Sequence, residues 1–185
     1  MANDIDFLLN HLQIHEPVHI IGYDIGGMFA NAFATRHADR TASHVWGECL
    51  LPVPELPEAL VAGREGVYLG YFLDKTHNAS AISQKDLDYY TESYARPEAI
   101  RCAFDVYRAF PTDAAENAEW IAKHGKCNVR TLGLNGEKSR RRAQVMRTIE
   151  GTFQVAEVSE SGHYLAEENP EGFAAAVLEF IKAEQ

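Results

Sequence analysis

The stretch Gly22-Tyr23-Asp24-Ile25-Gly26-Gly27 decides the fold of this 185-residue chain. The β-branched run over residues 18–23 predicts a strand, and the apolar residues Met28, Phe29 and Phe33 then recur at helical spacing. A strand that passes through a tight glycine turn directly into a helix is typical of an α/β fold, in which strands alternate with helices. We therefore expect this turn at the carboxyl end of a strand in a parallel sheet.

The rest of the chain continues this alternation. Apolar periodicity predicts further helices over residues 3–15, 139–148 and 170–183, and further strands over residues 43–47, 128–134 and 152–158. Strands separated by helices pair in parallel, and such sheets bind ligands beyond the carboxyl ends of their strands.

A helical insert interrupts the alternation. Three prolines between residues 51 and 57 exclude both a helix interior and a central strand, so they mark a boundary. From residue 58 to 126 the pattern is helical and rich in aromatic side chains, with a turn around Pro97. We expect residues 1–57 and 127–185 to form the core, and the insert between them to lie over the carboxyl ends of the strands.

Composition limits the partners of the chain. It has 17 Lys and Arg against 27 Asp and Glu, and a net charge of −10 repels both nucleic-acid phosphates and anionic lipid headgroups. Its three cysteines, Cys49, Cys102 and Cys127, form no CxxC pair, which favours reduced, mostly buried thiols over disulfides or a zinc site. Because no apolar run fits a membrane span or a signal peptide, we expect a soluble protein and favour a cytoplasmic location.

Residues 22–27 have the form of a nucleophile elbow, with Asp24 where serine is more familiar. Small residues are needed there because the turn is strained and the following helix packs closely on the strand. The alternative is a glycine turn in which Asp24 only caps the helix. A carboxylate nucleophile attacks without a base, but the ester that it forms must be hydrolysed by an activated water. The elbow hypothesis therefore requires a histidine with a carboxylate behind it.

His163 is the candidate base. It lies in Ser161-Gly162-His163-Tyr164-Leu165, after the last predicted strand and before the last helix, which is the third place in the chain order nucleophile, acid, histidine. The other seven histidines lie in predicted helices, strands or the insert, where a packed or solvated imidazole is the ordinary state.

Two carboxylates could support His163: Glu48 after the second strand, and Glu137 after the third. In many hydrolases of this type the acid lies two residues beyond the place of Glu137, where this chain has Ser139, which cannot stabilise an imidazolium charge. Glu48, at the carboxyl end of a strand, is the favoured acid, and Glu137 remains the alternative.

These segments resemble one family. The chain is similar to α/β-hydrolases of the epoxide hydrolase and dehalogenase branch: residues 22–27 resemble the aspartate elbow, residues 161–170 the histidine segment, and residues 96–110 the helical cap. It is most similar to Cif-like epoxide hydrolases, which have an Asp-Ile-Gly elbow and a charge-relay glutamate after the following strand. Gly47-Glu48-Cys49-Leu50-Leu51-Pro52 fits that segment, so the resemblance supports Glu48 as the relay acid.

The resemblance also implies the groups that open an epoxide. The ring oxygen needs a hydrogen-bond donor while the carboxylate attacks carbon, and a phenol stays protonated at neutral pH. Tyr107 takes the place of the family's cap tyrosine and Tyr68 that of its partner, with Tyr71 as a second candidate for the partner. Cif-like enzymes have histidine at the partner position, whereas other epoxide hydrolases use two tyrosines. Each tyrosine could instead be a packed aromatic, and the covalent route implies no metal or redox cofactor.

The residues beside the nucleophile bear on the substrate. Fluoroacetate-type dehalogenases hold the substrate carboxylate with arginines where this chain has Ile25 and Met28, and the tryptophan that assists halide departure is lacking near Tyr68. The resemblance therefore favours hydrolysis of a small apolar epoxide to a vicinal diol over haloalkane or haloacid dehalogenation. A third hypothesis is a catalytically impaired α/β-hydrolase-like protein that binds an apolar ligand.

The family's fold normally opens with further strands and a His-Gly-x-Pro loop that gives one oxyanion N–H, and none of these precedes Asp4. We expect the C-terminal portion of the fold, with the Ile25 N–H as oxyanion donor. Turnover is expected to suffer, because loss of one such donor costs about 10²–10³-fold in rate. Residues 18–23 would form an open apolar edge. We expect homo-oligomers through it, or completion by another chain; a monomeric mass by light scattering would contradict this.

Overall fold

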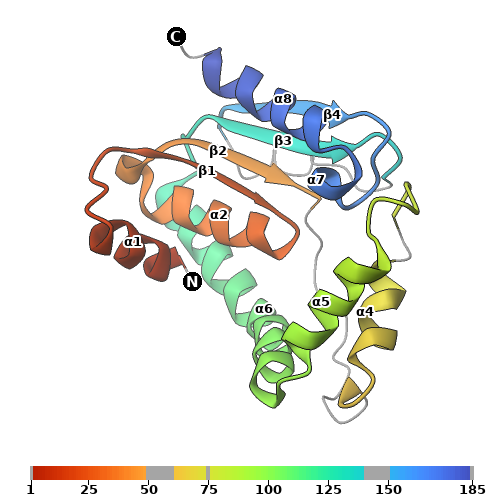
Figure 1. Cartoon of the computed structure of the whole chain (residues 1–185). Coiled ribbons are helices and arrows are strands. Elements are labelled where there is room, and N and C mark those ends of the chain that lie inside the picture. Colours follow the sequence, from red (N-terminus) through yellow and green to blue (C-terminus); the bar gives the residue numbers. More distant parts are fainter. Residues whose placement is uncertain (1, 49–60, 74–75, 140–150, 184–185) are drawn as a thin grey trace.

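A parallel four-stranded sheet forms the centre of the computed structural model, which describes residues 2–48, 61–73, 76–139 and 151–183 (Figure 1). Its strands are β1 (Val18–Tyr23), β2 (Thr41–Gly47), β3 (Thr131–Gly136) and β4 (Phe153–Val158), in the order β1-β2-β3-β4. The helices are α1 (Ala2–His11), α2 (Ile25–Arg36), η1 (Ala38–Arg40), α4 (Glu65–Leu73), α5 (Gln84–Tyr94), α6 (Pro97–His124), α7 (Leu165–Glu168) and α8 (Pro170–Lys182). Every neighbouring pair of strands is parallel, so the predicted α/β class is confirmed.

The described elements agree in type with the predictions and differ at their ends. The first helix ends at His11 rather than at residue 15, because the chain turns through Gln13 at a φ of 56°. The third strand begins at Thr131 rather than at residue 128, because its pairing with β2 and β4 begins there. The predicted helix over residues 139–148 and the proline-rich boundary lie outside the described residues.

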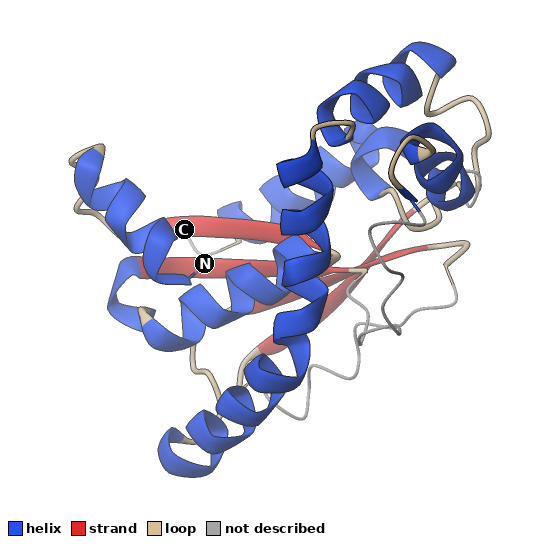
Figure 2. Ribbon diagram, turned by 90° about the horizontal axis from the view of Figure 1, so that it is seen from below, coloured by secondary structure: helices blue, strands red, loops and turns tan. Residues whose placement is uncertain are grey.

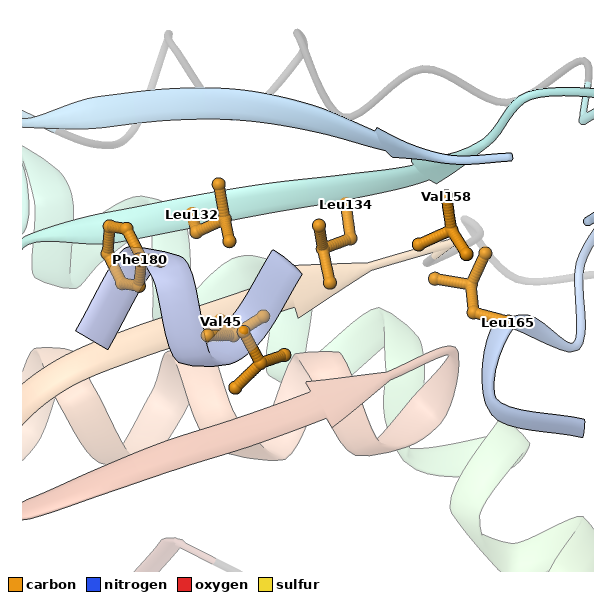
Figure 3. Close-up of a cluster of buried hydrophobic side chains, with 7 residues drawn as sticks. Val45, Leu132, Leu134, Val158, Leu165 and Phe180 are labelled. Atoms are coloured by element: carbon orange, nitrogen blue, oxygen red, sulfur yellow. The ribbon is translucent and has the colours of Figure 1, made fainter. Parts of the chain in front are cut away.

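Helices pack on both faces of the sheet. On one face, α2 lies so close to β2 that a Cβ atom on Gly27 would come within 2.9 Å of Trp46 Cδ1. On the other face, α8 covers a buried cluster that consists of Val45, Leu132, Leu134, Val158, Leu165, Val177 and Phe180 (Figure 3). Each large apolar side chain buried in this way stabilises the fold by about 1.5–3 kcal/mol. The cluster fixes β2, β3 and β4 relative to one another.

Strand β1 lies at one edge of the sheet. Within the described part of the chain it pairs with β2 alone, and its residue Ile21 is 42% exposed. Helix α1 exposes Phe7 and Leu8 as well. Association through this edge remains a prediction.

The insert is helical where it is described. Figures 1 and 2 show α4 and α5 at the end of the sheet toward which the strands run. Val61, Ile100 and Phe104 are buried among these helices. The turn expected around Pro97 is the start of α6, where proline occupies the first turn. The division into a core and a cap stays a prediction.

Two further expectations concern cysteine and the membrane. Cys127 is buried, but Cys102 on α6 is exposed, so the expectation of mostly buried thiols is wrong for Cys102. Cys49 lies outside the described residues. Among the described helices, none combines the length and the apolar character that a bilayer span requires.

Candidate active site

Asp24 lies in the turn between β1 and α2, with φ 51° and ψ −132°. Positive φ is unusual for a residue with a side chain and marks local strain. The strand and the helix approach so closely there that a Cβ atom on Gly22 would come within 2.2 Å of the Gly26 carbonyl oxygen. The Asp24 side chain makes no capping hydrogen bond to α2 and is 38% exposed. This geometry fits the elbow hypothesis and not the alternative in which Asp24 caps the helix.

His163 lies between Asp24 and Glu48. Its Nε2 atom is 3.0 Å from Asp24 Oδ2, and its Nδ1 atom is 3.6 Å from Glu48 Oε2. The three residues follow β1, β2 and β4, and a parallel sheet brings the carboxyl ends of its strands together. The imidazole is 17% exposed, so it is largely withdrawn from solvent while Asp24 stays accessible.

Glu48 has a fully buried side chain and a φ of 45°. Its Oε1 atom accepts a hydrogen bond of 2.8 Å from the Gly136 N–H, and its Oε2 atom accepts one of 2.6 Å from the Ser139 hydroxyl. A buried carboxylate requires such donors, because desolvation of an unpaired charge is costly. The two donors are the last residue of β3 and a residue of the turn after it, the region where the alternative acid was expected.

Glu137, the alternative acid, is directed to the surface. Its carboxylate accepts hydrogen bonds from Lys138 Nζ at 2.9 Å and from the Glu160 N–H at 3.0 Å. These two interactions, with that of Lys138 the larger, hold the pKa of Glu137 below its usual value. The structure therefore brings Glu48, and not Glu137, beside the imidazole.

The two predicted ring-opening tyrosines belong to the insert. Tyr68 on α4 packs edge to face against Phe72 and Phe104, at centroid distances of 5.1 Å and 5.9 Å. Burial is the main cause that raises the pKa of Tyr68, so its hydroxyl is protonated at neutral pH. Tyr107 on α6 contacts Phe110. Tyr71, the second candidate for the Tyr68 role, is 64% exposed. Hydrogen bonding of either phenol to a substrate stays a prediction.

Two carboxylates near the site, those of Glu167 and Glu168, make contacts that the sequence did not predict. The Tyr23 hydroxyl donates to both carboxylate oxygens of Glu167, at 3.3 and 3.2 Å, and burial is the main cause that raises the pKa of this phenol. The next residue, Glu168, accepts hydrogen bonds from the His77 and Asn78 N–H groups of the insert and from the Tyr164 N–H. In the sequence these contacts are marked by nothing more than two adjacent acidic residues, Glu167 and Glu168. Such a pair is typical of the solvated first turn of a helix.

Over the described ranges, no three His, Cys, Asp or Glu side chains are arranged to hold a metal ion.

Comparison with known proteins identifies the architecture. No protein-family model and no curated protein matches the chain. Among solved structures, Cfl2 from Burkholderia cenocepacia matches with a TM-score of 0.89 and 24% identity over 97% of this chain and 70% of that chain. The epoxide hydrolase CorEH matches with a TM-score of 0.86 and 20% identity over 100% and 74%. ALR0039 from Nostoc sp PCC 7120, a candidate α/β-hydrolase, matches with a TM-score of 0.87 and 24% identity over 98% and 71%. The chain has the α/β-hydrolase fold, and the likeness at these identities concerns the fold alone.

Proposed function

We propose that this chain is a hydrolase that opens a small apolar epoxide through a covalent ester on Asp24 and releases a vicinal diol. One observation carries the proposal: His163 lies between Asp24 and Glu48, with contacts of 3.0 and 3.6 Å. The α/β-hydrolase fold, and the similarity of the chain to CorEH among other solved structures, support the same class.

In the first step the Asp24 carboxylate attacks a ring carbon. The carbon–oxygen bond of the ring breaks, and the ring oxygen takes a proton from Tyr107 or Tyr68. The partly exposed carboxylate of Asp24 is open to such a substrate. The raised pKa of Tyr68 suits a donor that is protonated at neutral pH, and the phenolate that forms recovers its proton from solvent.

In the second step a water hydrolyses the ester. His163 Nε2 takes one proton of the water while the water oxygen bonds to the carbonyl carbon of Asp24. The oxyanion accepts a hydrogen bond from the N–H of Ile25, which is the first residue of α2. Backbone N–H groups in the first turn of a helix have no partner within the helix. The bond between the carbonyl carbon and the alcohol oxygen then breaks, and the diol leaves with the proton from the imidazolium, which Glu48 stabilises meanwhile. Asp24, left as a carboxylic acid, releases the second proton of the water to solvent and is again a carboxylate.

Dehalogenation of an uncharged alkyl halide is the second candidate, because the same carboxylate can displace a halide by the same first step. A haloacid substrate is disfavoured, since Ile25 and Met28 provide no positive charge for its carboxylate. The rival from another class is a protein that binds an apolar ligand without turnover.

The test is mass spectrometry of the His163→Gln variant after exposure to terminal epoxides, an uncharged alkyl halide and a haloacetate. Removal of the base stalls the reaction at the ester, so we expect an adduct of epoxide mass on the peptide that contains Asp24. Asp24→Asn, which removes the nucleophile and keeps the side-chain shape, is the control and forms no adduct. An adduct from the alkyl halide alone would assign dehalogenation, and a folded variant without any adduct would favour the ligand-binding protein.

A further inference from the structure

The end of β3 and the turn that follows it supply two hydrogen-bond donors to Glu48. The Gly136 N–H binds Oε1 at 2.8 Å, and the Ser139 hydroxyl binds Oε2 at 2.6 Å. The same Oε2 atom faces His163 Nδ1 at 3.6 Å. One oxygen of Glu48 is therefore shared by a hydroxyl in close contact and an imidazole at a longer distance.

This turn is fixed to the loop that carries His163. The Lys138 N–H donates to the Ser161 carbonyl at 2.9 Å, and the Glu137 N–H donates to the Val158 carbonyl at 3.0 Å. The turn and the loop pack so closely that a Cβ atom on Gly136 would lie 1.9 Å from the Gly162 carbonyl oxygen. The hydroxyl and the imidazole thus belong to one interlocked pair of segments, while Glu48 reaches them from β2.

We infer that Ser139 is a positioning residue, whose hydroxyl holds Oε2 of Glu48 in the orientation that faces His163. The inference rests on the proposed function, because it assigns a role within the same relay. The carboxylate is attached through a terminal torsion with a broad energy profile, so a single hydrogen bond from the Gly136 N–H to Oε1 restrains rotation of the whole carboxylate group only weakly. A charge-assisted hydrogen bond from Ser139 restricts this rotation. Serine cannot replace the acid at this place, but it orients an acid that comes from the neighbouring strand.

The hydroxyl also acts on the charge of the relay. By donating to Oε2, the Ser139 hydroxyl stabilises the state in which Glu48 is ionised and His163 is neutral. It stabilises a state with one more proton less, because such a state has less negative charge on Oε2. The other charged groups of the turn, Glu137 and Lys138, pair with each other, and Lys138 also pairs with Glu160 at the surface. Asp24 faces the opposite edge of the imidazole. Loss of the Ser139 hydroxyl should therefore move the acid limb of the hydrolysis rate to higher pH.

The test compares Ser139→Ala with Ser139→Thr, which keeps the hydroxyl. Single-turnover mass spectrometry follows formation and hydrolysis of the Asp24 ester as a function of pH. We expect Ser139→Ala to hydrolyse the ester about 10- to 100-fold more slowly, the range for one hydrogen bond to a charged group, and to shift the acid limb upward. Ester formation stays near the wild-type rate, and Ser139→Thr restores both properties. Ser93→Ala is the matched control, because it removes a hydroxyl that donates to a backbone carbonyl within α5.

A second measurement needs no substrate. In the tautomer that directs a proton from His163 Nδ1 toward Glu48, this proton gives an NMR resonance that depends on the position of Glu48 Oε2, which lies 3.6 Å away. We expect Ser139→Ala to shift this resonance or to broaden it by solvent exchange, and Ser139→Thr and Ser93→Ala to leave it in place. If the wild type forms no ester, the proposed function fails, and the resonance still decides the role of Ser139. An unchanged resonance in a folded Ser139→Ala variant would overturn the inference, as would wild-type hydrolysis at every pH.

Discussion

Glu48→Gln removes one negative charge beside His163 and keeps the size of a fully buried side chain. At 3.6 Å and an effective dielectric constant of about 20, the attraction between a carboxylate and an imidazolium is about 4–5 kcal/mol. Each 1.36 kcal/mol corresponds to a factor of about ten, so the full loss is about 10³-fold. The amide of glutamine keeps a dipole at this place and its oxygen accepts a hydrogen bond from the Gly136 N–H, so part of the attraction is retained. We therefore expect ester hydrolysis to slow by about 10²- to 10³-fold.

Rapid-quench mass spectrometry of Asp24 distinguishes the two steps. Ester formation does not create an imidazolium, so its rate in Glu48→Gln should stay within about threefold of the wild type, and the ester should accumulate. Glu137→Gln is the matched control, because it makes the same chemical change on an exposed side chain that pairs with Lys138. Its hydrolysis rate should remain that of the wild type. Wild-type hydrolysis in a folded Glu48→Gln variant, or a larger loss in Glu137→Gln, would refute the assignment of the relay acid.

Two further predictions concern stability and packing. Burial lowers the pKa of His44 from 6.5 to about 4, so as the pH falls the unfolded chain binds a proton on this imidazole before the folded chain does. The contribution of His44 to the free energy of unfolding, measured in urea, should therefore fall by about 3 kcal/mol between pH 7 and pH 4. A His44→Gln variant, which lacks the titrating group, is the comparison. Gly136→Ala places a Cβ atom 1.9 Å from the Gly162 carbonyl oxygen and must displace the His163 loop by about 1 Å, so the rate of ester hydrolysis should fall by up to about 10²-fold. Gly26→Ala is the control, because its Cβ atom meets nothing within 4 Å, and its melting temperature should equal or exceed that of the wild type.

Local chemistry explains why the elbow and the sheet could be predicted from the sequence. A β-branched run, a glycine turn and a helical period follow one another within a few residues of the sequence. Asp24 lies directly after a strand, and His163 lies in the loop between the last strand and the next helix. The preference for Glu48 over Glu137 came partly from its place at a strand end, and the structure puts Glu48 beside His163. The strand ends themselves were less predictable, because they depend on where a neighbouring strand begins to pair.

Contacts between distant segments could not be predicted. Ser139 and Glu48 are 91 residues apart, and Tyr23 and Glu167 are 144 residues apart. Neither spacing has a periodic or turn signal, since the packing of β3 on β2 and of α7 against the elbow creates these contacts. Serine at position 139 indicated in the sequence that this residue cannot be the acid, but nothing in the sequence indicated that its hydroxyl binds Glu48.

Backbone strain adds an independent argument about the two carboxylates. Asp24 and Glu48 both have φ near 50°, and each follows the last residue of a strand. Glycine at either position would relieve about 1–2 kcal/mol of strain, so stability alone does not account for a carboxylate there. Glu160 has a similar φ of 48°, yet its carboxylate contacts Lys138 at the surface, so strain by itself does not define a site. Asp24 and Glu48 differ from Glu160 because their strained turns direct both side chains to opposite edges of one imidazole.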